Sequence, residues 1–167
     1  TDLAEPIESA LAMSARPGEG EFELALDQDE EVPMCSLDRH RLTEILVNLF
    51  RNAREAMVEK GTSERRVVVR VRRPAEGRVR IEVEDDGVGI PTENLERVFT
   101  HGFTTKKNGH GFGLHSSANA AREMGGSLHA ITFGTTAPGG YTDAQLAAIR
   151  HVVRPLARVG ETLALMR

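Results

Sequence analysis

The chain has 167 residues, which is enough for one domain with a sizeable hydrophobic core. Its net charge of −4 gives no general attraction to nucleic acid, so we expect no nucleic-acid partner. Cys35 is the only cysteine, which excludes an internal disulfide and fits a reducing compartment.

The N-terminal stretch predicts a helix followed by a strand. Apolar residues spaced by four predict a short helix over residues 3–14. After a Pro-Gly break, alternating apolar and polar residues predict a half-buried strand at 22–26. The acidic run Asp27–Glu31 predicts a solvated loop.

A long helix should follow, with Ser36 or Asp38 as its cap. Beside its apolar stripe, Asn48, Asn52 and Glu55 recur at i, i+4 and i+7 and therefore share a face. Half-buried amides need hydrogen-bond partners. Two interpretations stay open at this point: the amides bond to a nearby loop, or they face a polar ligand site where an amide oxygen can bind a hard cation.

Two alternating strands are predicted next, at 66–72 and 79–84. In the first strand valines occupy one face and arginines the other, and Glu82 and Glu84 of the second strand are plausible partners for the arginines. The period of two places Asp85 in phase with the core face of the second strand. Such a carboxylate either caps the turn at the strand end or accepts a hydrogen bond from a ligand.

A long connection at 91–108, with a helical piece at 93–99, predicts a functional lid or a disordered loop. It leads through a Gly-x-Gly-x-Gly sequence into a helix over 114–124. Backbone N–H groups at a glycine-rich helix start form an anion site. The chain contains no Gly-x-x-x-x-Gly-Lys-Ser/Thr sequence, which excludes a P-loop.

The histidines do not have the paired spacing of a zinc site, either among themselves or with Cys35. We therefore expect His101, His110 and His115 to be residues of the lid surface or of the following helix.

The order of the asparagine helix, the Asp-x-Gly-x-Gly sequence at 85–89 and the Gly-x-Gly-x-Gly-Leu sequence at 109–114 resembles the ATP-binding domain of sensor histidine kinases. That domain belongs to the superfamily of the gyrase, heat-shock chaperone and mismatch-repair ATPases. The resemblance covers about residues 2–128. It implies an α/β two-layer sandwich, the Bergerat ATP-binding fold, in which a mixed sheet of four or five strands is backed by helices. ATP and Mg²⁺ would lie between the long helix and the lid.

The resemblance also implies roles for individual positions. Asn52 would supply the amide oxygen that binds Mg²⁺, and Asn48 and Glu55 would lie near the phosphates. Asp85 would accept a hydrogen bond from the adenine amino group. The other implied nucleotide contacts lie in the two glycine sequences and in the lid, where Phe99 accompanies Phe103: Gly87, Gly89, Phe103, Thr105, Lys106, Gly109, Gly111, Gly113 and Leu114.

Asn48 bears on the reaction. In the ATP-hydrolysing members of the superfamily a glutamate at this position activates water, and an amide is no general base at neutral pH. With Asn48 and Lys106 as catalytic residues, the resemblance implies transfer of the γ-phosphoryl group to a histidine, by positioning and charge neutralisation. The implied protein is a histidine kinase of two-component signal transduction. Its partners would be a separate dimerisation domain that carries the acceptor histidine, a response regulator, and a second copy of the full-length chain.

We expect three segments: a connector helix at 1–16 from a missing upstream dimerisation domain, the ATPase domain at 17–134, and an atypical helical tail at 135–167. The Thr142-x-x-Gln145 capping box predicts the start of the tail helix, and its apolar stripe would pair between chains. Two alternative functions stay open: a non-kinase ATPase of the same superfamily, and a degenerate nucleotide-binding module.

The chain shows neither a segment with the length and apolar character of a membrane span nor a signal peptide, so we expect a cytoplasmic domain. The absence of an initiator methionine suggests a piece of a longer protein, for which a membrane anchor stays open.

Overall fold

The computed structural model describes residues 3–15, 23–28, 37–61, 65–73, 78–104, 111, 113–131 and 160–166. Along the chain these residues form α1 (Ala4–Ser14), β1 (Glu23–Gln28), α2 (Arg39–Lys60), β2 (Arg66–Arg72), β3 (Arg78–Asp85), the 3₁₀ turns η1 (Thr92–Asn94) and η2 (Arg97–Phe99), α3 (Gly113–Glu123), β4 (Ser127–Ile131) and β5 (Gly160–Met166).

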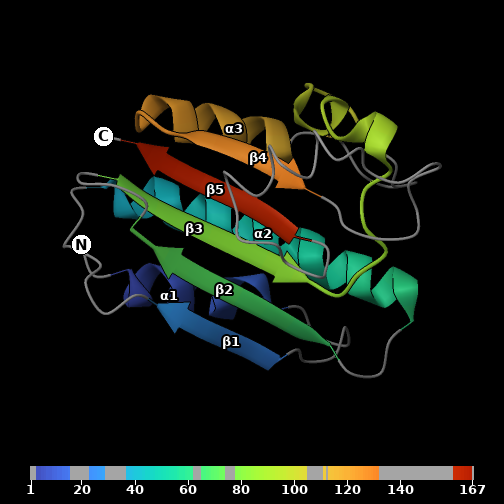
Figure 1. Ribbon diagram of the computed structural model, residues 1–167, viewed down its shortest axis with the longest axis horizontal. Helices are drawn as coiled ribbons and strands as arrows, with labels where there is room; N and C mark the ends of the chain where they lie inside the picture. The colour runs from blue at the N-terminus through green and yellow to red at the C-terminus, as the bar shows by residue number, and fades with distance from the viewer. Residues whose placement is uncertain are drawn as a thin grey trace.

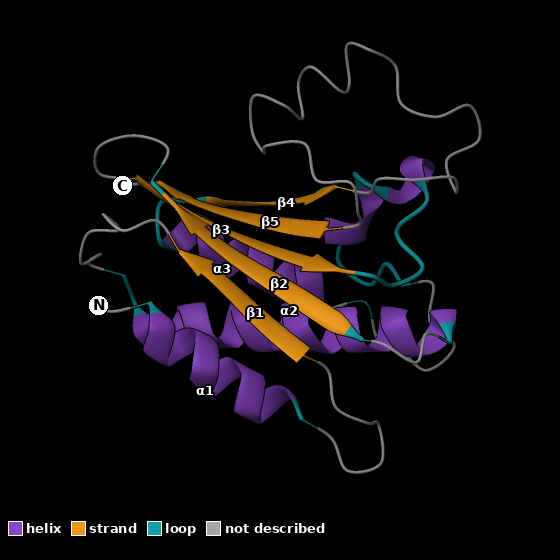
Figure 2. Ribbon diagram, turned by 60° about the horizontal axis from the view of Figure 1, so that its bottom comes forward, coloured by secondary structure: helices purple, strands orange, loops and turns teal. Residues whose placement is uncertain are grey.

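The strands form one sheet in the order β1-β2-β3-β5-β4, and α1, α2 and α3 cover the same face of it (Figures 1 and 2). β1 pairs with β2 in parallel, whereas the other neighbours are antiparallel. The predicted two-layer α/β sandwich with a mixed sheet is therefore confirmed. None of the helices in the described ranges combines the length and the apolar character that a membrane crossing requires.

The helix α2 carries most of the core that the helical layer contributes. Asp38, one of the two predicted caps, accepts a hydrogen bond from the Arg41 backbone N–H (3.1 Å), and Gly61 ends the helix in a left-handed conformation. The predicted apolar stripe faces the sheet, and α1 packs beside α2 on the same face. The buried residues of the stripe include Ile45, Leu49, Phe50 and Ala53. Because α2 is held along this stripe, its neighbouring polar face is fixed as well.

The alternation predicted for β2 and β3 is confirmed. The three valines in phase on β2 are fully buried, and the Arg70 guanidinium donates to the Glu84 carboxylate across the sheet (2.6 Å). In the same register, β3 ends on Asp85, which pairs with Val67. The core pattern of β3 thereby determines that a carboxylate lies at the buried end of the strand.

The helix α1 belongs to the same hydrophobic core as the rest of the described chain. Leu3, Ile7 and Ala10 are buried against α2, and Arg39 forms an ion pair with Glu5 (2.8 Å). The expected boundary between a connector and the ATPase domain at residue 16 therefore does not correspond to a boundary in the packing. That this helix connects to a dimerisation domain stays a prediction.

Two local expectations were wrong. Asp27 does not begin a solvated loop: it is part of β1, and its carboxylate pairs with the Arg72 guanidinium on the neighbouring strand. The cross-strand arginine supplies the partner that the acidic run did not reveal. The helical piece expected at 93–99 consists of two separate 3₁₀ turns, η1 and η2.

The largest correction concerns the expected helical tail. Residues 160–166 form the strand β5, which lies inside the sheet between β3 and β4; residues 135–159, including the capping box at Thr142, lie outside the described residues. The tail was predicted to be helical from a capping box and an apolar stripe, and its alanines, leucines and methionine also favour helices in isolation, but residues 160–166 form a strand. The edges of β3 and β4 outweigh this helical preference, because each edge offers β5 a full ladder of backbone hydrogen bonds.

The place of β5 predicts a strong effect of proline at Ala164, which pairs with Arg80 on one side and Ser127 on the other. Ala164→Pro removes an N–H from a central strand and should lower the free energy of unfolding by at least about 2 kcal/mol. Ala164→Val keeps the N–H and is the matched control. Urea unfolding of the two variants measures the difference. Equal stability of both variants would contradict a central strand at this position.

Candidate nucleotide site

The site is built around the end of β3. The side chain of Asp85 is buried, with only 5% of the residue exposed, and its Oδ1 accepts a hydrogen bond from the Gly87 backbone N–H (2.7 Å). Of the two interpretations left open by the sequence, the structure shows the first, because the carboxylate caps the turn. That it also accepts a hydrogen bond from a ligand stays a prediction. Among the described residues one backbone N–H donates to this carboxylate, which leaves most of its acceptor capacity to other donors.

Burial raises the pKa of Asp85 to about 7, because desolvation disfavours the charged form. The Gly87 N–H opposes this shift and the carboxylates of Asp86 and Glu84 add to it, while Lys60 opposes it weakly. The Gly87 N–H alone does not offset the cost of burying the ionised form. A ligand that brings an N–H donor to this carboxylate would stabilise the charged form.

Gly87 allows the turn after β3 to approach α2 closely. A Cβ added at this residue would lie 2.4 Å from the Ala56 Cβ and 2.7 Å from the Asp85 Oδ1, so no other residue fits without a shift of backbone. The Val88 N–H donates to the Ala56 carbonyl (3.2 Å), and Lys60 Nζ donates to the Asp86 carbonyl (2.9 Å). Gly89 follows with φ +79°. The Asp-x-Gly-x-Gly turn is thus fastened to the C-terminal half of α2.

The polar stripe of α2 runs from this turn towards α3. Asn48 lies at the α3 end, where its Nδ2 donates to the Ser117 hydroxyl (3.1 Å) and to the Gly113 carbonyl (3.4 Å). Asn52 and Glu55 follow one and two turns later on α2, half-buried, towards the level of Ala56 and the Asp85 turn. The structure therefore brings the predicted asparagine stripe, the aspartate turn and the start of α3 together.

The start of α3 is shaped by the second glycine sequence. Gly111 has φ +70°, and a Cβ there would lie 2.4 Å from both the Gly102 carbonyl carbon and the Phe103 carbonyl oxygen. The Gly102 N–H donates to the Gly111 carbonyl (3.1 Å). This bond joins the described part of the lid to a residue two places before α3. Gly113 is the first residue of α3, and Leu114 packs on the core. The free N–H groups of this helix start suit an anion.

The described part of the lid is anchored by two aromatic residues. Phe99 packs against the hydrophobic core, and the Arg97 guanidinium lies 4.8 Å from the centre of the Phe103 ring. Thr105, Lys106 and Gly109 lie outside the described residues, so the roles expected for them stay predictions.

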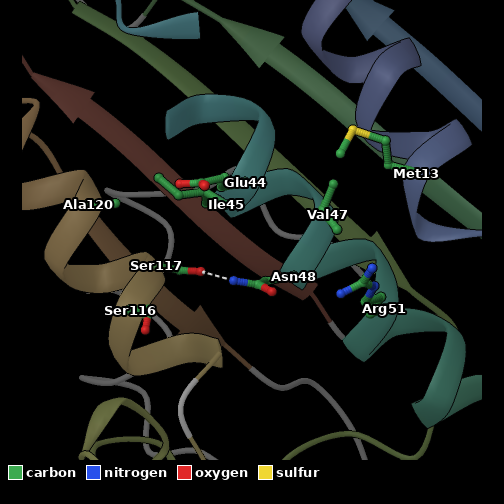
Figure 3. A pocket seen from close by; sticks show the side chains of 9 residues that line it. All are labelled: Met13, Glu44, Ile45, Val47, Asn48, Arg51, Ser116, Ser117 and Ala120. Carbon is green, nitrogen blue, oxygen red and sulfur yellow. Dashed lines mark hydrogen bonds between the residues drawn. The ribbon is translucent and has the colours of Figure 1, made fainter. Parts of the chain in front are cut away.

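Beside Asn48 the surface opens into a groove of about 390 Å³ between α2 and α3. Figure 3 shows Asn48 pointing across from α2 to Ser117 on α3, with Met13 of α1 at the rim. Besides these three residues, the lining consists of Glu44, Ile45, Val47, Arg51, Ser116 and Ala120. The groove lies at the α3 end of the polar stripe, away from the Asp85 turn.

The sequence did not reveal several of these contacts. Ser117 as a partner of Asn48 and Lys60 as a partner of the Asp86 carbonyl depend on how α2 packs against α3 and against the β3 turn. No spacing in the chain encodes those distances. For the contact of Lys60 with the Asp86 carbonyl, the only indication in the sequence was the place of Lys60 at the end of the asparagine helix.

Within the described residues no group of three or more histidine, cysteine, aspartate or glutamate side chains could hold a metal ion. Mg²⁺ commonly binds through one or two carboxylates together with substrate phosphates and water. Asn52 is half-buried on the stripe between the Asp85 turn and the α3 start, and its role as a Mg²⁺ ligand stays a prediction.

A buried carboxylate at a strand end, a polar helical stripe and a glycine-rich helix start define a site for a ligand with an N–H donor at one end and anionic groups at the other. Residues 37–151 match the family described as histidine kinase-, DNA gyrase B-, and HSP90-like ATPase. The chain belongs to this family.

Curated relatives of the chain include sensor proteins and sensor histidine kinases. It is 36% identical to the sensor histidine kinase ZraS of Salmonella typhi over 65% of this chain and 22% of that protein. It is 35% identical to the sensor protein FixL of Bradyrhizobium diazoefficiens over 84% of this chain and 27% of that protein. The chain thus spans about a quarter of the length of these relatives.

Solved structures agree in fold. The catalytic domain of the histidine kinase ThkA superposes with a TM-score of 0.69 at 20% identity, over 99% of this chain and 93% of that one. Full-length ShkA in complex with AMPPNP gives a TM-score of 0.65 at 22% identity, over 98% of this chain and 29% of that one.

The raised pKa of Asp85 predicts a pH dependence of stability. The folded pKa of about 7 lies above the ordinary value of 3.8, so the fold favours the neutral carboxyl. The associated stability is present below about pH 4 and is lost as the pH rises through 7, by roughly 3–4 kcal/mol. Urea unfolding from pH 4 to 8 measures this loss.

Asp85→Asn is the matched control, because its amide oxygen can still accept from Gly87 and does not titrate. Burial also raises the pKa of Glu82, so both proteins should retain a residual slope. The variant should lose the part of the slope that Asp85 causes. Identical pH profiles for the two proteins would show that the pKa of Asp85 is not raised in the folded state.

Proposed function

We propose that this domain binds Mg·ATP and donates the γ-phosphoryl group to a histidine on a separate dimerisation domain in two-component signal transduction. The observation that carries the proposal is the buried Asp85 carboxylate, held at the end of β3 with a single backbone donor and facing the turn of Gly87. An adenine amino group would supply the missing donor, whereas guanine presents an acceptor at the same position.

The phosphates would lie at the other end of the polar stripe. The N-terminus of α3, preceded by Gly111 and begun by Gly113, offers backbone donors and the positive end of the helix dipole. Asn52 would hold Mg²⁺, which neutralises phosphate charge when it is bound. Glu55, Lys106 and the other predicted lid positions would complete the nucleotide site.

Asn48 favours a protein acceptor over water. Its Nδ2 donates to Ser117 and Gly113 on α3, so the side chain acts as a positioning donor, and an amide is no general base at neutral pH. In the proposed transfer, a nitrogen of the acceptor imidazole bonds to the γ-phosphorus as the bond to the β–γ bridging oxygen breaks, and ADP leaves. The domain would contribute positioning and electrostatic stabilisation.

The groove between α2 and α3 supports the approach of such an acceptor, because it opens beside Asn48 at the phosphate end of the stripe. Phosphate would then pass from the histidine to a response regulator, and the full-length protein would act as a homodimer. The proposal of these partners rests on the similarity to sensor histidine kinases.

Asp85→Asn should weaken ATP binding by roughly ten- to a hundredfold, because one charged hydrogen bond to adenine is lost. GTP binding should change far less, because guanine offers no amino donor at that position. The ratio of ATP affinity to GTP affinity should therefore fall. Calorimetry with both nucleotides measures the two effects. Asp86→Asn, which removes the neighbouring charge, should leave the preference unchanged. Equal affinity of the parent for ATP and GTP would exclude adenine recognition by Asp85.

Asn52→Ala should abolish the tightening of ATP binding by Mg²⁺ and retain metal-free binding. The reason is that the variant loses a metal ligand and keeps the adenine contact. Titrations with Mg²⁺ and with a chelator separate the two contributions. If Mg²⁺ tightens binding in the variant as much as in the parent, the ligand lies elsewhere.

A further inference from the structure

A chain of hydrogen bonds along α3 ends on the base of the lid. The Arg122 guanidinium donates to Asn119 Oδ1 (2.8 Å), Asn119 Nδ2 lies 3.1 Å from His115 Nε2, and His115 Nδ1 lies 3.0 Å from the Phe99 carbonyl oxygen. His115 and Asn119 are half-buried. Neither takes part in the site described above.

The chemistry of its first and last groups, the Arg122 guanidinium and the Phe99 carbonyl, fixes the direction of every hydrogen bond in this series. A guanidinium only donates, so the Asn119 oxygen faces Arg122 and the Asn119 nitrogen faces His115. An amide nitrogen also only donates, so His115 Nε2 must be the acceptor. The Phe99 carbonyl only accepts, so His115 Nδ1 carries the proton. The ring is therefore neutral and in one defined tautomer.

The bond to Phe99 reaches the nucleotide-facing part of the lid through short turns. The Thr100 N–H donates to the Arg97 carbonyl (2.9 Å), and the Phe103 N–H donates to the Thr100 carbonyl (3.1 Å). His101 adds a second contact, because its ring meets the His115 ring edge to face with centroids 5.0 Å apart. Movement of Phe103 would therefore strain the hydrogen bond between His115 Nδ1 and the Phe99 carbonyl, which we call the tie.

We propose that His115 is a positioning residue, which ties the base of the lid to α3 as its neutral Nδ1–H tautomer and orders the lid before nucleotide binds. The described part of the lid is held at a second point, where the Gly102 N–H donates to the Gly111 carbonyl. The bond from His115 to Phe99 and the bond from Gly102 to Gly111 thus hold lid residues 99–104 at two points. The part of the proposal that concerns nucleotide affinity rests on the proposed function, whereas the tie itself does not.

Long-range ¹H–¹⁵N NMR of the nucleotide-free protein above neutral pH reads the tautomer directly. The expected pattern is a proton on His115 Nδ1 and a bare Nε2. A proton on Nε2 with a bare Nδ1 overturns the proposal, because Phe99 would then have no donor from this ring. This readout needs no nucleotide.

His115→Asn and His115→Leu form a matched pair of similar size. The asparagine amide can still donate from the position of Nδ1, whereas leucine cannot. Amide hydrogen exchange at Thr100–Phe103 should be faster in the leucine variant and close to the parent in the asparagine variant, with α2 equally protected in both. Equal exchange at the lid in the two variants overturns the tie. Unequal α2 protection would mean that leucine at position 115 disturbs the fold. Asn119→Leu, which removes the donor to His115 Nε2, then takes the place of His115→Leu in the comparison.

The same pair tests the consequence for binding. Loss of one ordering hydrogen bond should weaken Mg·ATP binding by roughly three- to tenfold in His115→Leu relative to His115→Asn. Equal affinities with unequal lid exchange would overturn the role in nucleotide binding and leave the tie in place. A parent protein that shows the Nδ1–H tautomer but binds no ATP would defeat the proposed function rather than the tie.

Discussion

The close approach of the Gly87 turn to Ala56 on α2 is the contact on which the rest of the site depends. It is possible because glycine has no Cβ at a place where one would lie 2.4 Å from its neighbour. The contact fixes the turn after Asp85 against α2 at Ala56, next to Glu55 and one turn of the helix from Asn52. At the other end of the stripe, Asn48 ties α2 to α3 through Ser117. Between these two contacts, the buried apolar stripe of α2 holds the helix against the sheet.

Local patterns predicted the parts of the fold that are decided locally. The asparagine helix, its cap at Asp38 and the two strands that follow all have periodicities that a single segment can satisfy. The same period of two placed Asp85 on the core side of β3, and the structure buries it there. The roles of Thr105, Lys106 and Gly109 rest on the resemblance to sensor histidine kinases, because these residues lie outside the described part of the chain.

Apart from the helical piece at 93–99, the features that the sequence did not predict share a cause, since each depends on a partner that is remote in sequence. β5 is a strand because β3 and β4 lie on either side of it, although its alanine and leucines favour a helix locally. Asp27 extends β1 because Arg72 of β2 faces it. The bond from His115 to Phe99 crosses from α3 to the 3₁₀ turn η2, and no motif encodes that distance. Tertiary context decided these elements, and a single sequence carries little of it.

The central claim is that one nucleotide spans the distance from the Asp85 turn to the N-terminus of α3. Backbone amide shifts recorded while Mg²⁺ and a non-hydrolysable ATP analogue are added test it most directly. The account predicts the largest changes at Gly87 and Gly89 and at the first residues of α3, with little change along β1. Saturable changes confined to the groove at Met13 and Ser116, with the Gly87 turn unaffected, would contradict it.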